Sequence, residues 1–275
     1  MNSLVGKIAV VTGASRGAGR GIALALGEAG ALVYVTGRST KIVSTENLPG
    51  NIEMTAEEVS ARGGHGIPVF CDHIKDHQVK SLFDRVRKEQ GHIDILVNNV
   101  WGGYEKLYGA RGWDDGTKMS DPFWKQSLTR WDTMFIAGLR AHMVASYFAA
   151  PLMITQHRGL IVNTTWSDEG KYLDNVFYDV AKAAVNRLAF ALAQDLKKYG
   201  ITAVALTPGF MRTERSIAAG IIEDLDETES PEYIGRAVVA LAGDSKAMEK
   251  SGNTLRVGDL AKEYGFTDID GRQIK

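Results

Sequence analysis

The sequence is poor in the features that mark secreted, membrane-spanning and nucleic-acid-binding proteins. Its single cysteine, Cys71, cannot form an intrachain disulfide, and residues 1–7 lack the apolar core of a signal peptide, so we expect a cytoplasmic location. The longest apolar runs, "KIAVV" and "ITAVAL", are too short to cross a bilayer. A net charge of −1 offers no basic surface for nucleic acid or anionic lipid, and we expect neither as a partner.

Short apolar segments alternate with amphipathic ones along the chain. Rich in β-branched residues, the short segments predict strands at 7–12, 32–36, 66–70, 93–99, 159–165, 201–206 and 254–257. Apolar residues at helical spacing predict helices at 18–29, 53–62, 77–90, 129–156, 177–199 and 231–242. This alternation favours an α/β fold, a Rossmann-like doubly wound parallel sheet of about seven strands with helices on both faces. We expect one domain over residues 1–275.

Long connections should lie at the carboxyl end of the strands, where open α/β sheets bind ligands. Residues 38–51 and 101–126 exceed the usual strand-to-helix length, and we expect substrate-loop segments near 101–126 and 210–230. Aromatic side chains there could line an apolar pocket, or they could simply hold the loops in place or fill an interface, and both interpretations stay open. They are Trp101, Tyr104, Tyr108, Trp113, Phe123, Trp124, Trp166, Phe177 and Phe210.

A glycine-rich stretch, "TGASRGAG" at 12–19, follows the first predicted strand and opens a helix. Glycines there permit close backbone approach, and the helix amino terminus offers free N–H groups to a pyrophosphate. A glycine-rich loop that follows a strand and opens a helix is the context of a dinucleotide-binding site. The alternative is that these glycines form a purely structural turn. The candidate cofactor-binding residues of this loop are Gly13, Ser15, Arg16, Gly17 and Gly19.

The end of the second predicted strand reads Gly37-Arg38, without the carboxylate that NAD-preferring folds present to the ribose 2′-hydroxyl. Arg16 and Arg38 could together face a 2′-phosphate, with Lys41 as a third, more weakly supported cation. NADP(H) is therefore favoured over NAD(H). The alternative is that either arginine is only a solvated surface charge.

Tyr178 and Lys182 are four positions apart in the predicted helix 177–199, so they project into the same space. A free phenol has a pKa of about 10, and a nearby ammonium would lower that pKa by favouring the phenolate. The pair is thus a candidate proton-transfer site. On its own, it could equally be a tyrosine and a snorkelling lysine on an amphipathic helix.

Together, "TGASRGAG", "FYDVAK", "CD" at 71–72, "VNNV" at 97–100 and "TPGFMRT" at 207–213 resemble the short-chain dehydrogenase/reductase family over essentially the whole chain. Within it, "AGLRAHMVAS" and the C-terminal tail are most similar to one group of mammalian members and their bacterial relatives. The resemblance implies NADPH-linked carbonyl reduction, with Tyr178 as the proton donor and Lys182 also donating a hydrogen bond to the nicotinamide ribose. It also implies a homodimer or homotetramer.

Two positions depart from the family pattern. The usual substrate-binding serine is replaced in "NTTWSDEG", where counting back from Tyr178 gives Thr165, with Ser167 in reserve, whereas aligning from Asn163 would give Trp166. Thr165 could instead merely finish a strand. The asparagine that supports a water-linked proton path would align with Gly138 and is missing.

The resemblance assigns further cofactor contacts. Asp72 should contact the adenine, the segment from Pro208 to Thr213 should hold the nicotinamide carboxamide, and Asn99 should be a structural or cofactor-side polar group. His73 and His77 have helical metal-ligand spacing, but no third ligand is apparent, so we expect no metal.

The sequence therefore predicts an oxidoreductase acting on a small carbonyl or alcohol substrate, apolar or aromatic in character. A dinucleotide-binding sensor or scaffold with little catalysis is the main alternative, and a dehydratase or epimerase that keeps its cofactor bound is another.

Overall fold

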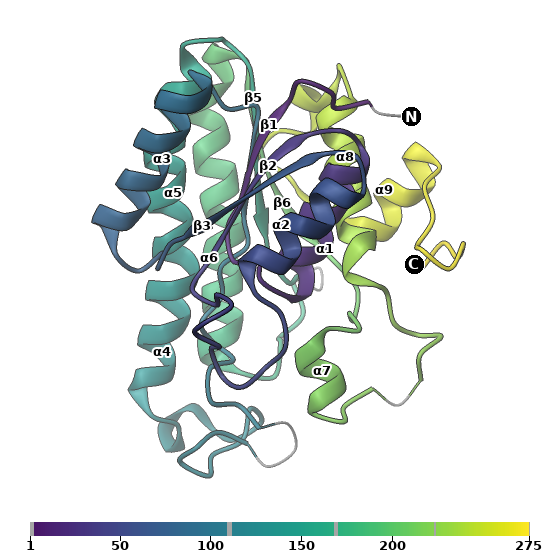
Figure 1. Cartoon of the computed structure of the whole chain (residues 1–275). Coiled ribbons are helices and arrows are strands. Elements are labelled where there is room, and N and C mark those ends of the chain that lie inside the picture. Colours follow the sequence, from purple (N-terminus) through teal and green to yellow (C-terminus); the bar gives the residue numbers. More distant parts are fainter. Residues whose placement is uncertain (1–2, 109–111, 168–169, 223, 275) are drawn as a thin grey trace.

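The computed structural model describes residues 3–108, 112–167, 170–222 and 224–274. Within these ranges, seven parallel strands form one sheet in the order β3-β2-β1-β4-β5-β6-β7 (Figure 1). This order confirms the predicted Rossmann-like fold, because the chain winds outward in both directions from β1 and β4. The strands are β1 (Ile8–Val11), β2 (Leu32–Gly37), β3 (His65–Phe70), β4 (Ile95–Asn98), β5 (Gly159–Thr164), β6 (Ile201–Thr207) and β7 (Thr254–Arg256).

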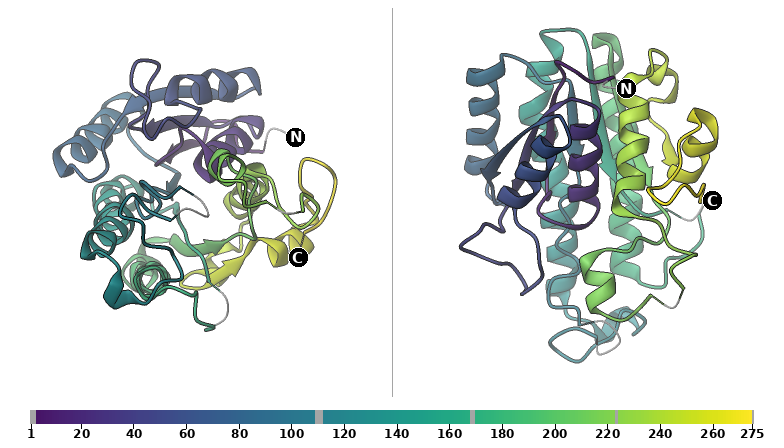
Figure 2. Two further views of the ribbon diagram at one scale, coloured as in Figure 1. Left: turned by 90° about the horizontal axis from the view of Figure 1, so that it is seen from below. Right: turned by 45° about the vertical axis from the view of Figure 1, so that its right-hand side comes forward.

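Helices cover both faces of the sheet, as the end-on view in Figure 2 shows. One apolar core joins the strands to α1 (Gly17–Glu28), α2 (Ile52–Ala61), α8 (Pro231–Gly243) and α9 (Val257–Tyr264). The other core joins the opposite face to α3 (Asp76–Gln90), α5 (Ala141–Ile154) and α6 (Val176–Leu196). Each crossover helix can bury its apolar stripe only against the sheet, which fixes the three-layer arrangement.

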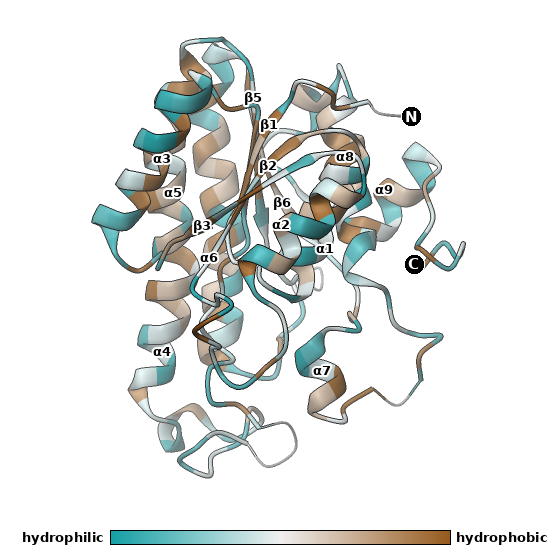
Figure 3. Ribbon diagram, in the orientation of Figure 1, coloured by the Kyte–Doolittle hydropathy of each residue, from teal (hydrophilic) through white to brown (hydrophobic). Residues whose placement is uncertain are grey.

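The central strands are buried on both faces. All residues of β1, β4 and β6 are buried, and Figure 3 shows apolar residues concentrated in the sheet and on the inner sides of the helices. Strands covered on both sides read as continuous apolar runs, which is why the sequence reveals them. No helix in the described ranges combines the length and apolar character that a membrane crossing requires.

The long helix predicted at 129–156 is divided in the structure. It consists of α4 (Leu128–Met134), a π-helical turn η3 (Phe135–Arg140) and α5. A π turn inserts extra backbone into a helix and often marks a functional position. The short helix α7 (Glu214–Ala218) and α9 were not predicted. Single 3₁₀ turns are η2 (Phe123–Lys125), η4 (Lys197–Tyr199) and η5 (Ala247–Lys250).

A third apolar cluster lies beyond the carboxyl ends of the strands. It contains Trp113, Met134, Phe177, Tyr178 and Ala181, all buried. The cluster joins the 101–126 segment to α4 and to the first turns of α6. It therefore holds one wall of the region where a ligand of this fold would bind.

Candidate active site

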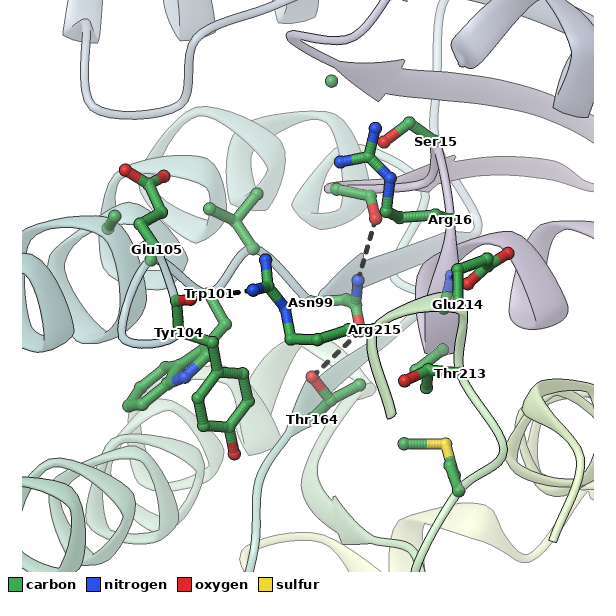
Figure 4. Close-up of a pocket in the computed structure, with 18 of the residues that line it drawn as sticks. Ser15, Arg16, Asn99, Trp101, Tyr104, Glu105, Thr164, Thr213, Glu214 and Arg215 are labelled. Atoms are coloured by element: carbon green, nitrogen blue, oxygen red, sulfur yellow. Dashed lines mark hydrogen bonds between the residues drawn. The ribbon is translucent and has the colours of Figure 1, made fainter. Parts of the chain in front are cut away.

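A cavity of about 460 Å³ runs along the carboxyl edge of the sheet (Figure 4). Such a volume suits a small-molecule site. The glycine loop, the loops after β2 to β5, the start of α6 and the segment between β6 and α7 line it. Three predicted candidates lie outside the lining: Gly19, the weakly supported Lys41, which pairs with Glu57 instead, and the reserve Ser167. The other predicted site residues contribute to it: Gly13, Ser15, Arg16, Gly17, Arg38, Asp72, Asn99, Thr165, Tyr178, Lys182, Pro208 and Thr213.

Gly19 acts from behind the cavity wall. A Cβ atom at this position would lie 2.2 Å from the Gly13 carbonyl oxygen and 2.5 Å from Asn99 Nδ2. Gly13 and Gly17 have φ values of +65° and +55°, the region that favours glycine. The Asn99 amide fastens the turn, because Nδ2 donates to the carbonyls of Thr12 and Gly13, each at 3.1 Å. Asn99 is thus seen as a structural clamp on the loop.

The amino terminus of α1 already engages an anionic group. The backbone N–H of Gly17 donates to a carboxylate oxygen of Glu214, the first residue of α7, at 2.7 Å. A helix amino terminus favours negative charge through its free N–H groups and its dipole. The carboxylate shows that this amide selects an anionic acceptor, so the glycine loop fits the phosphate of a dinucleotide.

Arg16 and Arg38 reach the same end of the cavity, and both have internal partners. The Arg16 guanidinium donates to Pro49 O at 2.9 Å, Thr45 Oγ1 at 2.9 Å and Ser39 Oγ at 3.0 Å, which folds the 38–51 loop around it. Its acceptors on this loop are uncharged groups. Arg38 forms an ion pair with Glu105 instead. The arrangement brings two guanidinium groups to the end of β2, where the sequence placed them.

Asp72 lies at the end of β3, with Oδ1 accepting from the Ile74 N–H at 3.3 Å. The adjacent His73 is buried and hydrogen-bonded to Thr36 at 2.8 Å, and burial lowers the pKa of this imidazole to about 3. His73 is therefore a neutral core group. Over the ranges that the structure describes, His, Cys, Asp and Glu side chains form no group of three that could hold a metal ion.

The segment after β6 turns at Pro208 and enters α7 through a cap. Thr213 Oγ1 accepts from the Ser216 N–H at 3.1 Å, and the Ser216 hydroxyl accepts from the Thr213 N–H at 2.8 Å. This reciprocal capping box fixes the start of α7. It places Glu214 and Arg215 over the cavity.

Tyr178 and Lys182 lie one turn apart on α6, whose first turn is fixed by Asn175 accepting from the Tyr178 N–H at 3.0 Å. The Tyr178 hydroxyl is hydrogen-bonded to the Tyr104 hydroxyl at 2.9 Å, and either group can donate. The Lys182 Nζ lies 3.7 Å from the centre of the Trp101 ring. Both α6 side chains are 7% exposed, so the pair is buried at the inner end of the cavity.

The sequence analysis predicted that Lys182 lowers the pKa of Tyr178, and the structure contradicts this direction. Burial raises the pKa of Tyr178 well above its usual value, and the neighbouring Tyr104 acts in the same direction. Burial also lowers the pKa of Lys182 to about 7. Desolvation disfavours the charged form of each group, and it is the largest cause of both shifts.

Thr165 is 4% exposed at the end of β5, beside Lys182. Its hydroxyl donates at 3.4 Å to the backbone oxygens of Trp166 and Lys182. Ser167 lines a separate surface hollow and is absent from the cavity lining. Of the two candidates, Thr165 therefore lines the same cavity as Tyr178, and Ser167 does not.

The aromatic residues fall into three groups. Trp101, Tyr104, Trp166 and Phe210 line the cavity. Trp113 and Phe177 are buried in the third apolar cluster, where they hold the loop. Tyr108, Phe123 and Trp124 are exposed. Pocket lining is thus seen for the first group and loop packing for the second, whereas a role in an interface stays a prediction for the three exposed rings.

Sequence reasoning missed the contacts that close the cavity. Arg215 donates to the Tyr104 carbonyl at 2.9 Å and pairs with Glu46 (Figure 4). Tyr104 was noted only as an aromatic residue, not as the partner of Tyr178. The available signal was the charged pair Glu214-Arg215 directly after the predicted carboxamide-binding segment.

Comparison with known proteins agrees with this geometry. Residues 7–220 match the family described as short chain dehydrogenase. The chain is 39% identical to mouse dehydrogenase/reductase SDR family member 1, over 98% of this chain and 85% of that protein, which confirms the mammalian group indicated by the sequence. A putative dehydrogenase from Xanthomonas campestris superimposes with a TM-score of 0.81 at 25% identity, covering 99% of this chain and 94% of the other. A metagenomic short-chain oxidoreductase in complex with NADP gives a TM-score of 0.69 at 25% identity, with coverages of 92% and 98%.

Proposed function

The chain belongs to the short-chain dehydrogenase/reductase family, an NAD(P)-dependent class of CH–OH and C=O oxidoreductases, and on that premise we propose that it reduces apolar or aromatic carbonyl compounds with NADPH. One observation carries the proposal. The Tyr178 hydroxyl and the Lys182 ammonium face the same cavity that the glycine loop lines at its other end.

When bound, a reduced nicotinamide supplies the hydride that a carbonyl carbon accepts. Tyr178 donates the proton to the carbonyl oxygen, so full alkoxide charge does not build up. Its raised pKa keeps the phenol protonated and able to donate. Thr165 orients the same oxygen through its hydroxyl, which exchanges a weak 3.4 Å backbone contact for the substrate. Lys182 holds the ribose and stabilises the phenolate left after transfer.

The cofactor residues extend from this point to the other end of the cavity. Gly13, Ser15, Gly17 and Gly19 form the phosphate cradle, Asp72 contacts the adenine, and Asn99 clamps the loop. Pro208 and Thr213 hold the carboxamide. These assignments rest on their common position along the cavity wall and on the family pattern.

Preference for NADP(H) is supported by the charge at the end of β2. No acid follows Gly37, and Arg38 with Arg16 supplies two guanidinium groups for a 2′-phosphate, provided that Arg38 leaves Glu105. In the Arg38→Gln variant we expect NADPH affinity to fall about tenfold and NADH affinity to stay unchanged. Fluorescence titration with both cofactors tests this, with Lys80→Gln on the remote surface of α3 as the matched control. Equal losses for both cofactors would contradict the assignment.

An apolar or aromatic substrate is supported by the lining near Tyr178. The cavity that Tyr178 lines is also lined by Trp101, Trp166, Leu107, Phe210 and Ile221. Burying carbon surface against these side chains stabilises a substrate by roughly 25 cal/mol per Å².

The Tyr178→Phe variant tests the catalytic assignment. Removing the hydroxyl should reduce turnover of a carbonyl panel at least a hundredfold while NADPH binding persists. Tyr199→Phe, in the η4 turn that follows α6, is the matched control and should keep full turnover. Wild-type protein that binds NADPH without oxidising it across ketones, quinones and aldehydes would instead favour the sensor. Net consumption of NADPH would exclude a dehydratase or epimerase.

A homodimer or homotetramer of single-domain subunits is supported by apolar side chains left exposed on α5 and α6. Met143, Tyr147, Val180 and Phe190 are between 39% and 66% exposed. Light scattering after size-exclusion chromatography tests this, and a strictly monomeric species would contradict it. A cytoplasmic location remains part of the proposal, supported by a buried and unpaired Cys71.

A further inference from the structure

The Lys182 ammonium is buried without an acidic partner. Among the described residues, its Nζ has neither an ion pair nor a hydrogen bond with a side chain or backbone group. Its nearest aromatic partner is the face of the Trp101 ring, 3.7 Å from Nζ, followed by the Tyr178 ring at 5.5 Å. A cation placed over an indole face is attracted by the ring quadrupole, most strongly when water is excluded.

The Trp101 ring can occupy this place because residue 138 lacks a side chain. A Cβ atom on Gly138 would lie 2.6 Å from Cζ3 and 2.7 Å from Cε3 of Trp101. Gly138 belongs to the π-helical turn η3, directly behind the ring. The ring therefore fills the space that any larger residue at 138 would need.

The Trp101 ring is held by packing and not by a hydrogen bond of its indole N–H to any described residue. Trp101 Nε1 is buried and has no hydrogen-bond partner. A buried indole usually finds an acceptor for this group. The Trp101 indole N–H makes no hydrogen bond with the described residues in this position, whereas the ring face contacts the Lys182 ammonium. Its edge-to-face contact with Tyr178, at 5.6 Å and 90°, places it against both members of the α6 pair.

We propose that Trp101 is a positioning residue for the proton-transfer site: its indole face holds the Lys182 ammonium beside Tyr178, and Gly138 is the residue that makes room for the ring. This inference rests on the proposed function of the site. It also explains how the chain works with glycine at the position where the family usually has asparagine, since the ring occupies that space.

Few other charges act on Lys182. The titratable groups that face it are Tyr178 on its own helix, Tyr104 on the loop after β4 and His142 on α5. Burial and the neighbouring ammonium lower the pKa of His142 to about 3, so this imidazole is neutral at the pH values of interest. The raised pKa values of both tyrosines keep them neutral as well. The indole face is left as the group that favours the ammonium over the free amine.

Trace labelling of the cofactor-free protein with acetic anhydride, followed by peptide mass spectrometry across a pH series, measures the titration of Lys182 directly. In Trp101→Leu the inflection should move down by about one pH unit, because the ammonium loses its partner and stays buried. In Trp101→Phe, whose aromatic face attracts a cation less strongly, the inflection should lie between those of the wild type and Trp101→Leu. The exposed Lys88 in the same digest is the internal control. An unchanged or upward-moving inflection in Trp101→Leu would overturn the proposal.

Gly138→Ala tests whether Gly138 makes room for the Trp101 ring. In the wild-type background the added methyl must displace the ring, so the Lys182 inflection should move down and carbonyl turnover should fall at least tenfold. In the Trp101→Leu background the same substitution should lower carbonyl turnover less than threefold, because the space beside residue 138 is already free. Equal losses in both backgrounds would show that Gly138 does not serve the ring.

These two readouts separate the inference from the proposed function. Lysine labelling needs neither substrate nor cofactor, so it can support the Trp101 contact even if Tyr178→Phe retains turnover. Conversely, loss of turnover in Tyr178→Phe with an unmoved Lys182 titration in Trp101→Leu would keep the proposed function and discard the inference. Should Trp101→Leu fail to fold, Trp101→Phe and Gly138→Ala provide the same comparison.

Discussion

The two ends of the cavity are held together by different physical means. At the nucleotide end, the contacts across the opening are polar or ionic: Glu214 with the Gly17 amide, Arg38 with Glu105, and Arg215 with Glu46. At the reaction end, aromatic rings surround the α6 pair: Trp101 over Lys182 and Tyr104 against Tyr178. Figure 4 shows Trp101 and Tyr104 on one side of the cavity and Arg16 and Glu214 on the other.

The difference matches what each end must do. Exposed and half-exposed ion pairs stabilise a protein little, so a phosphate can replace them at small cost. Buried aromatic packing excludes water, which strengthens electrostatic interactions and moves pKa values. The contacts at the proposed nucleotide end can thus be exchanged for a phosphate, whereas the packing at the proposed reaction end provides a fixed environment with little water. Four substitutions test this contrast.

Gly19→Ala should have the largest effect, at the nucleotide end. The added Cβ would lie 2.2 Å from the Gly13 carbonyl, so the loop must move. We expect NADPH affinity to fall at least a hundredfold and the free energy of unfolding to drop by about 1–3 kcal/mol. Gly243→Ala, where nothing lies within 4 Å of the new Cβ, is the matched control. NADPH affinity within threefold of wild type would show that the cradle tolerates the change.

Lys182→Met tests the cost of burying a charge at the reaction end. Turnover should fall about a hundredfold, while the free energy of unfolding at pH 6 should rise by about 3 kcal/mol. The pKa of Lys182 is lowered from 10.5 to about 7 by burial, so below pH 7 the folded wild type bears the full cost of the charge.

Between pH 7 and 10.5 the unfolded lysine binds more protons than the folded one, so wild-type stability rises with pH and the advantage of Lys182→Met shrinks. Urea unfolding at pH 6 and pH 9, with Lys88→Met as control, measures the difference. An advantage that does not change with pH would show that Lys182 is not buried as a charge.

Tyr104→Phe should have a moderate effect confined to the reaction end. The hydroxyl of Tyr178 loses its 2.9 Å partner, while both rings keep their stacked packing. We expect turnover to fall about tenfold with NADPH affinity unchanged. The exposed Tyr108, on the same loop, provides the control Tyr108→Phe. A parallel loss of NADPH affinity would mean that Tyr104 serves the nucleotide end as well.

Glu214→Gln should have the smallest effect and the opposite sign. Without its charge, residue 214 competes less well with a phosphate for the Gly17 N–H, so NADPH affinity should rise about threefold. The gain should be larger at low ionic strength than at high. Titrations at both ionic strengths, with the exposed Glu249→Gln as control, test this. Weaker binding would indicate that the carboxylate helps to hold the cofactor.

Features set by neighbouring residues were predictable from the sequence. The strands, most helices and the glycine loop follow from apolar periodicity and from glycine where a side chain would collide. The division of the 129–156 helix by η3 was not, because the π turn accommodates the Trp101 ring packed on Gly138. Likewise, α7 has only five residues, too few for a periodic pattern, and its Glu214 and Arg215 contact residues far away in the sequence.

The candidate site likewise has some features that the sequence predicts and others that only the tertiary structure reveals. Sequence alone determined that Tyr178 and Lys182 share a helix face and that a glycine-rich turn precedes α1, since both follow from spacing along one element. Tertiary structure decided that Tyr104, 74 residues away, meets the Tyr178 hydroxyl and that Glu214, 197 residues away, meets Gly17. It also decided the direction of both pKa shifts on α6, because desolvation depends on everything packed around a group and not on its neighbour one turn along.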